Sequence, residues 1–351
     1  MKAESRLFEN FKLNTLFTLQ NRIVMAPMTR LKADDNYVPT QLMVDYYARR
    51  ADTGLIITEG TVITPMGRGH NNVPGQFEQV QIAGWKKVTD AVHNKGGLIF
   101  NQIWHVGRVS HPSLSNGNLP ISASATVMTG RIPRMEGLTY GAARAVTREE
   151  IADLIAGFAK AAVNARKAGF DGIEIHGANG YLIDQFLHYD TNKRTDEYGG
   201  TPENMARFAY EVVKACGEAI GYERVGIRLS PAAYVNEIVG DVKDADVFIT
   251  LLSQLEQLPI AYVHTGNFND ATHYSELHDL TMSEFVRKHY QGIVIGCGSY
   301  TLDTAEMAVE NNQVDLVAMG RPFIANPDLI SLLLTKAEIK LYDVSMLQTL
   351  Y

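Results

Sequence analysis

Short apolar segments alternate with longer amphipathic segments along most of the chain. Eight apolar segments have the length of buried β-strands, and they cover residues 22–28, 54–60, 98–104, 172–177, 225–231, 260–266, 292–298 and 316–322. The segments between them have helical spacing of apolar positions, and they cover residues 41–51, 82–96, 147–169, 202–221, 245–258 and 301–312. Strands that alternate with helices require crossover connections and therefore a parallel sheet.

Eight strand–helix units without a break in composition predict one domain over residues 1–351. They favour an α/β fold with a single (β/α)₈ TIM barrel over an open doubly wound sheet. Residues 11–19 predict a β-hairpin before the first barrel strand. The segment from His105 to Arg144 has no counterpart in the other units, so it predicts a long, lid-like excursion after the third strand.

Composition narrows the class of protein. With 32 basic and 39 acidic residues the net charge is −7, which argues against a nucleic-acid partner. The two cysteines are too few for an iron–sulfur cluster or a four-cysteine zinc site. The first residues lack the apolar core of a signal peptide, and no apolar run approaches the ~20 residues of a membrane span. We therefore expect a cytoplasmic protein with no membrane partner; its subunit number stays open.

In a barrel of this kind the chemistry sits at the carboxyl ends of the strands. Polar groups and glycines collect at these ends in the sequence: Thr29, Glu59, Gly60, Gln102, Trp104, His105, His176, Asn179, Tyr181, Arg228, His264, Gly298, Ser299, Gly320 and Arg321. Each alone is explained by an end-of-strand polar group that is satisfied locally. Their recurrence at all eight ends predicts a site at the barrel mouth.

The last two units both read as a strand, a glycine turn and the start of a helix. Backbone N–H groups at Gly298 and Ser299 can approach an anion closely, and helix amino-termini favour negative charge. Gly320 is followed by Arg321, whose guanidinium suits bidentate contact with phosphate oxygens. The alternative is that these glycines only make tight turns. Two such loops in succession favour a phosphorylated ligand.

Strand alternation places Arg228 on the inner face, opposite to Ile227 and Leu229. A buried arginine needs an anionic or strongly polar partner. One interpretation is an ion pair with Glu174, which the same alternation also points inward. The other is a cation beside a cofactor ring that gains negative charge on reduction. Thr29 and Gln102 suit the edge of a heteroaromatic ring, since both can donate and accept hydrogen bonds.

The strand 172–177 ends in a group of polar residues. His176 and Asn179 can both direct N–H donors at one substrate oxygen, and such a pair stabilises the charge that develops there. Tyr181 is a candidate proton donor, because a phenol is neutral near pH 7. A zinc site is a poor fit to a His-x-x-Asn pair without a second well-spaced histidine or carboxylate; no metal is predicted.

Several blocks of the sequence resemble the old yellow enzymes, in the same order from about residue 6 to about residue 335. They are MAPMTR at 25–30, QIWHVGR at 102–108, HGANGYLIDQFL at 176–187 with TNKRTDEYGG behind it, RLSP at 228–231 and AMGRPFIANPDL at 318–329. The resemblance implies a (β/α)₈ barrel and an FMN-dependent, NAD(P)H-oxidising ene-reductase. A threonine at position 29 is similar to the branch of the family that lacks a thiol there.

The resemblance also implies a role for each site residue. Cofactor contacts are expected from Ala26, Pro27, Met28 and Thr29 along the flavin, from Gly60 and Gln102 at its pyrimidine edge, from Arg228 near N1, and from Gly298, Ser299, Gly320 and Arg321 at the phosphate. His176 and Asn179 would bind the substrate oxygen beside Trp104, and Tyr181 would protonate Cα. The tail departs from the family pattern, and Tyr342 is its candidate for reaching the pocket.

The implied reaction is ping-pong. NADPH, or NADH, gives a hydride to flavin N5 and leaves; an α,β-unsaturated carbonyl or nitro compound then takes the hydride at Cβ. Quinones are further expected acceptors. Two alternatives stay open: an FMN-binding redox sensor without significant turnover, and a barrel glycoside hydrolase that uses Glu59 and Glu174 as its two carboxylates.

Overall fold

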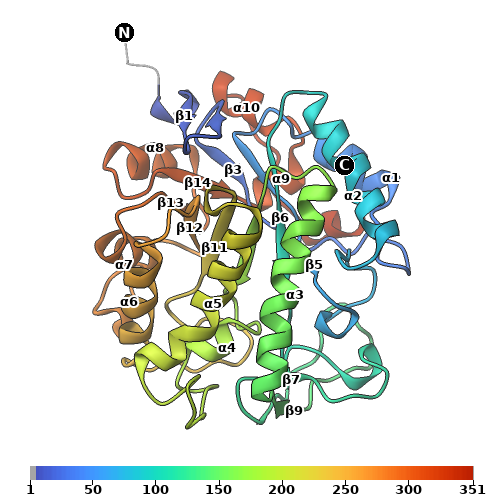
Figure 1. Ribbon diagram of the computed structural model, residues 1–351. Coiled ribbons are helices and arrows are strands. Elements are labelled where there is room, and N and C mark those ends of the chain that lie inside the picture. The colour runs from blue at the N-terminus through green and yellow to red at the C-terminus, as the bar shows by residue number, and fades with distance from the viewer. Residues whose placement is uncertain (1–4, 351) are drawn as a thin grey trace.

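The computed structural model describes residues 5–350, and its strands form a closed parallel barrel (Figure 1). The eight barrel strands are β3 (Ile23–Met25), β4 (Leu55–Ile57), β6 (Ile99–Trp104), β10 (Gly172–Gly177), β11 (Val225–Leu229), β12 (Tyr262–Thr265), β13 (Val294–Cys297) and β14 (Leu316–Met319). Each pairs in parallel with the next in this order, and β14 pairs with β3, which closes the ring. The predicted (β/α)₈ barrel is confirmed.

Helices connect the strands and surround the barrel. They are α1 (Gln41–Ala48), α2 (Gln79–His93), α3 (Arg148–Lys167), α5 (Pro202–Ile220), α6 (Asp244–Leu255), α7 (Met282–His289) and α8 (Leu302–Glu310). Shorter pieces are β5 (Thr61–Val62), α4 (Asp184–Leu187), α9 (Arg321–Ala325) and α10 (Leu329–Thr335), with 3₁₀ turns at Arg6–Phe8, Pro65–Gly67, Tyr222–Arg224, Ser275–Leu277 and Val344–Gln348. Thr147 and Glu150 form a reciprocal capping box at the start of α3.

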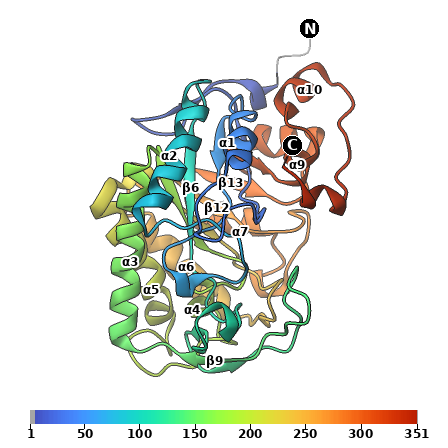
Figure 2. The same ribbon diagram turned by 90° about the vertical axis from the view of Figure 1, so that its right-hand side faces the viewer.

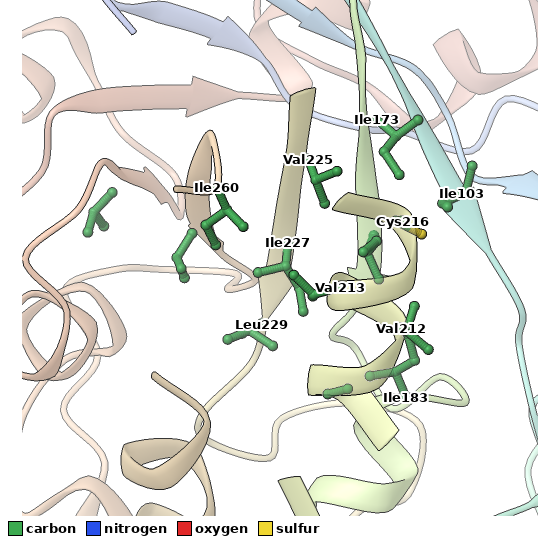
Figure 3. Packing of buried hydrophobic residues seen from close by; sticks show 14 of the residues in the cluster. Ile103, Ile173, Ile183, Val212, Val213, Cys216, Val225, Ile227, Leu229 and Ile260 are labelled. Carbon is green, nitrogen blue, oxygen red and sulfur yellow. The ribbon is translucent and has the colours of Figure 1, made fainter. Parts of the chain in front are cut away.

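Outward-facing residues of the strands pack against the helices. Ile173, Val225 and Ile227 lie beside Val213 and Cys216 of α5 (Figure 3), and all are fully buried. Because alternate strand residues point to opposite faces, this packing turns Glu174 and Arg228 into the barrel, as the sequence pattern predicts. Burial of this apolar layer holds the strands in register, and the register sets the positions of the inward polar groups.

The predicted hairpin closes one end of the barrel. β1 (Phe11–Lys12) and β2 (Thr18–Leu19) are antiparallel, and both are only two residues long. Leu13, Phe17 and Leu19 pack in one apolar cluster with inward residues of the strands, including Val24 and Ile57. The hairpin therefore blocks the amino-terminal end, and ligand access is left to the other end.

The excursion between β6 and α3 lies at the opposite end of the molecule, near α4 in both views (Figure 1, Figure 2). It contains a 3₁₀ turn at Pro112–Leu114 and a small sheet of β7 (Ile121–Ser122), β8 (Thr126–Val127) and β9 (Ala142–Ala145). A loop within it reaches the segment after β3, since Arg134 Nη1 donates to the Thr29 carbonyl at 3.4 Å. Among the helices of residues 5–350, none is both long and apolar enough to cross a bilayer.

Candidate active site

A cavity of about 610 Å³ opens at the carboxyl ends of the strands, within the ~300–1,000 Å³ range of small-molecule sites. Eight predicted site residues line it: Ala26, Pro27, Met28, Asn179, Arg228, Ser299, Gly320 and Arg321. The sequence reasoning missed other lining residues, among them Tyr234, Asn267, Phe268, Cys297, Tyr300 and 339–341. Tyr342 also lines the cavity, so the divergent tail forms part of its wall.

Arg321 and Ser299 meet at one end of this cavity. Arg321 Nη2 donates to Ser299 Oγ at 2.5 Å, which brings the last two strand ends together as predicted. Gly298 lines a neighbouring depression instead, and a Cβ there would lie 2.3 Å from the Asp270 nitrogen. The helix amino-termini contribute less to anion binding than the sequence suggested, because α9 has only five residues and α8 begins only at Leu302. The guanidinium and the loop N–H groups therefore provide most of the anion-binding capacity.

Arg228 is a buried cation that forms no ion pair with a carboxylate among residues 5–350. Its Nη2 lies 3.4 Å from Cys297 Sγ and its Nε donates to the Thr265 carbonyl at 3.5 Å. Burial opposes its charge, but Cys297, Tyr234 and, to a lesser degree, Glu174 outweigh burial, so the pKa of Arg228 is raised. Burial also opposes ionisation of Cys297, yet the Arg228 charge lowers the pKa of that thiol.

The alternative ion pair between Arg228 and Glu174 is wrong for the residues that the structure describes. Glu174 Oε2 instead lies 2.8 Å from His264 Nδ1, and its Oε1 accepts from Gln102 Nε2 at 2.8 Å. Burial opposes protonation of His264, but Glu174 outweighs it and the pKa of His264 is raised. The carboxylate is thus already neutralised by its neighbours, which leaves the Arg228 charge available to a ligand.

The other carboxylate of the hydrolase alternative is equally enclosed. Glu59 is 1% exposed, and its Oε2 accepts the Arg30 backbone N–H at 3.1 Å. Burial raises its pKa to about 7. Neither Glu59 nor Glu174 lines the cavity, so a sugar bound there would not meet two carboxylates.

Three rings form a compact cluster beside the cavity. The Trp104 and His176 rings are stacked with centroids 6.1 Å apart, and Tyr181 meets each of them edge-on at 4.9 Å. Burial, followed by the charges of Arg228 and His264, lowers the pKa of His176 well below its ordinary value, so its imidazole is neutral. Burial raises the pKa of Tyr181, so the phenol keeps its proton.

His176 Nδ1 is buried and has no hydrogen-bond partner among residues 5–350. An unpaired buried nitrogen costs stability, and a ligand that hydrogen-bonds to it removes that cost. Asn179 has a left-handed backbone, with φ of 62°, and projects into the cavity from the same loop. Asn179 thus lines the cavity, whereas His176 and Tyr181 pack on each other and on Trp104 without lining it.

Six further predicted residues do not line the cavity. The Thr29 carbonyl accepts a hydrogen bond from Arg134, and the Gln102 side chain donates one to Glu174. Trp104 belongs to the ring cluster with His176 and Tyr181. Gly60 has a packing reason of its own, because a Cβ there would lie 2.5 Å from Trp104 Cε3. The absence of a side chain at Gly60 therefore leaves the space that the Trp104 indole occupies.

Comparison with known proteins gives consistent matches over nearly the whole chain. A sequence profile of the NADH:flavin oxidoreductase / NADH oxidase family matches residues 6–340. The 12-oxophytodienoate reductase 7 of rice (Oryza sativa subsp. japonica) is 41% identical over 347 residues, which cover 94% of this chain and 88% of that protein. A probable flavin mononucleotide-dependent alkene reductase of Leishmania infantum is 42% identical over 322 residues, or 89% of this chain and 86% of that protein.

Solved structures agree with these matches. The old yellow enzyme homologue of Zymomonas mobilis superposes with a TM-score of 0.91 and 38% identity, over 98% of this chain and 97% of that chain. Morphinone reductase in complex with tetrahydroNAD superposes with a TM-score of 0.89 and 39% identity, over 97% of this chain and 93% of that chain. The likeness therefore extends to both the barrel and its loops.

Proposed function

The chain belongs to the old yellow enzyme family of NADH:flavin oxidoreductases, and from this membership we propose how its residues serve the reaction. The protein is an FMN-dependent NAD(P)H oxidoreductase of the ene-reductase type. One observation carries the residue assignment: Arg228, a buried cation that pairs with no carboxylate in the described part of the chain, lines a cavity of about 610 Å³.

The residues present fit FMN. Arg321 and Ser299, joined by their 2.5 Å contact, suit the phosphate together with Gly320 and the loop at Gly298. Ala26, Pro27 and Met28 offer a wall of modest polarity for a planar ring, with Thr29 next to them. Gln102 still has its carbonyl oxygen and one N–H free of Glu174, which suits the pyrimidine edge near Gly60.

Arg228 supplies positive charge where the ring would lie. A cation already neutralised by Glu174 could not do this, and the structure pairs Glu174 with His264 instead. When bound, FMN would supply the redox chemistry by which a hydride of NAD(P)H reaches the β-carbon of the alkene.

Residues at the end of β10 and in the loop after it bind the substrate and supply the proton. His176 and Asn179 hold the activating oxygen of the substrate, and their N–H groups stabilise the negative charge that develops there. Trp104 fixes the His176 ring by stacking, with centroids 6.1 Å apart. Tyr181 holds the proton that Cα receives, which is consistent with a pKa raised by burial.

Substrates of the relatives indicate small electrophilic alkenes. We propose α,β-unsaturated carbonyl compounds as the main acceptors, with nitroalkenes and quinones as further ones, since each presents an oxygen to the His176–Asn179 pair. NADPH is the proposed reductant, with NADH as the alternative. A cytoplasmic location stays a prediction.

The proposal is tested with purified protein. It should be yellow and release FMN on denaturation, and NADPH consumption should accelerate on addition of cyclohexenone. A preparation that stays colourless after incubation with FMN would falsify the proposal. Flavin binding without acceptor-dependent turnover would instead favour a redox sensor, and stopped-flow comparison of NADH with NADPH establishes the reductant.

A further inference from the structure

Tyr234 lies next to the amide of Asn179, although the two residues belong to different loops. Asn179 follows β10 and Tyr234 follows β11, and these strands are neighbours with His176 opposite Arg228. The Tyr234 hydroxyl donates to Asn179 Oδ1, and Ser230 Oγ lies 3.3 Å from the same oxygen. Two hydroxyls from one loop therefore meet the carbonyl end of one amide.

The backbone of Asn179 is held by the same loop. Its N–H donates to Ser230 Oγ at 3.0 Å, and its carbonyl accepts from Asn236 Nδ2 at 2.7 Å. With the backbone and Oδ1 both engaged, the Nδ2 group is left without a partner among residues 5–350. Asn179 lines the cavity, so this free N–H₂ group is its contribution to a ligand.

The direction of an amide depends on what its oxygen accepts. If Oδ1 and Nδ2 exchanged places, the Asn179 side chain would present an acceptor to the substrate oxygen, and the contact would become repulsive. A hydroxyl that donates to Oδ1 disfavours this exchange, because the phenol would then have to turn its proton away and accept from Nδ2. Ser230 has one proton and two acceptors, Asn179 Oδ1 at 3.3 Å and the Gly266 carbonyl at 3.2 Å. Its donation to the amide is therefore shared.

Of the two hydroxyls, that of Tyr234 is the main hydrogen-bond donor to Asn179 Oδ1. Burial raises the pKa of its phenol, so the hydroxyl keeps its proton over the ordinary pH range. Its ring is held edge-on against Phe268, with centroids 4.8 Å apart at 90°. Its hydroxyl donates to Asn179 Oδ1, and the Ser230 side chain is a second hydrogen-bonding neighbour of the phenol.

We propose that Tyr234 is a positioning residue for the reaction: its hydroxyl fixes the Asn179 amide so that Nδ2 donates to the substrate oxygen. This inference rests on the proposed function, because it requires an oxygen bound between His176 and Asn179. Ser230 supports the same orientation to a lesser degree.

A double-mutant cycle tests the proposal with holoenzyme. Tyr234→Phe, Asn179→Ala and the double variant are compared in cyclohexenone reduction and in binding of 4-hydroxybenzaldehyde, whose phenolate gives a long-wavelength absorption band when stacked on oxidised FMN. We expect Tyr234→Phe to raise the Kd of this probe about tenfold, with kcat/KM for cyclohexenone falling to a similar extent. In the Asn179→Ala background the same change should have no further effect, because its target is gone.

Tyr198→Phe is the matched control. It also removes a hydroxyl that donates to a side chain, Glu211 at 3.0 Å, but it lies away from the cavity. A Tyr234→Phe variant that binds the probe like Tyr198→Phe would overturn the proposal, as would an equal loss in the Asn179→Ala background.

Failure of the proposed function is recognised separately, from wild-type protein that lacks FMN or cyclohexenone turnover. If Tyr234→Phe does not fold, Ser230→Ala takes its place, with an expected two- to threefold rise in probe Kd that disappears without Asn179. An unchanged Kd in Ser230→Ala would then count against the proposal.

Discussion

A buried histidine below the site gives a prediction about stability and pH. His188 is fully buried, its Nδ1 lies 2.8 Å from Asp244 Oδ2, and its Nε2 lies 3.3 Å from Asp184 Oδ1. Burial opposes protonation, but the two carboxylates outweigh it and raise the pKa of His188 to about 10. Asp184 also accepts the Gly180 N–H at 2.7 Å, so this cluster supports the loop that carries Asn179.

The size of the effect follows from the two pKa values. At about 1.4 kcal/mol per pH unit, a rise from 6.5 to about 10 corresponds to stabilisation on the order of 5 kcal/mol. Because the folded state binds the proton more tightly, this stabilisation is complete below pH 6.5 and is lost as the pH rises towards 10. Replacing His188 by Gln should remove this pH dependence and destabilise the fold by about 3–5 kcal/mol near pH 7, since two buried carboxylates lose their cation.

Urea unfolding followed by circular dichroism between pH 6.5 and 10 measures the effect. Groups other than His188 titrate in both proteins, so the difference between wild type and His188→Gln isolates its contribution. His93→Gln is a suitable control, because His93 also contacts a carboxylate, Asp171 at 2.9 Å, but its side chain is 36% exposed. Unfolding midpoints of wild type and His188→Gln that run parallel across this pH range would refute the reasoning.

Three further changes have defined outcomes. Tyr181→Phe should slow enone reduction at least tenfold more than flavin reduction by NADPH, and equal slowing of both half-reactions in stopped flow would remove Tyr181 from proton donation. Arg228→Met should raise the Kd for FMN at least tenfold, measured by flavin fluorescence, with Arg228→Lys recovering part of the loss; unchanged affinity would contradict the assignment. Gly60→Ala should cost about 1–3 kcal/mol in urea unfolding, because its Cβ would lie 2.5 Å from Trp104 Cε3. Gly157→Ala, whose Cβ meets only Ile63 at 3.7 Å, should cost nothing.

Periodicity located the elements that carry the site. The apolar segment 172–177 corresponds to β10 (Gly172–Gly177), and the helix predicted after Thr147 begins at Arg148. These predictions succeed because a strand buried on both faces leaves a short apolar run, and a helix buried on one face leaves apolar positions at helical spacing. α4 has only four residues, which is too short for a helical pattern, and it was missed. The helix start expected after Gly320 is present as α9, which has only five residues.

The pairs that the inward-facing charged residues form inside the barrel could not be predicted in the same way. Alternation pointed Glu174 and Arg228 inward correctly, yet the carboxylate pairs with His264 at 2.8 Å. The pairing depends on the register between strands, in which His264 lies opposite Arg228 and Glu174 lies opposite Gln102. A single sequence shows which face a residue occupies, but not how far its strand slides along the next one.

Support for the catalytic loop comes from a segment without any periodic signal. Ser230, Tyr234 and Asn236 all bond to Asn179, and Asp244 bonds to His188. All four lie between the end of β11 and the first turn of α6, so one connection braces the loop after β10 from two sides. Since Asn236 and Asp244 support this loop without lining the cavity, changes at these two residues should alter substrate binding while FMN affinity stays constant. Residues that touch the ligand thus follow from strand ends, whereas those that orient them become visible only when neighbouring loops are placed together.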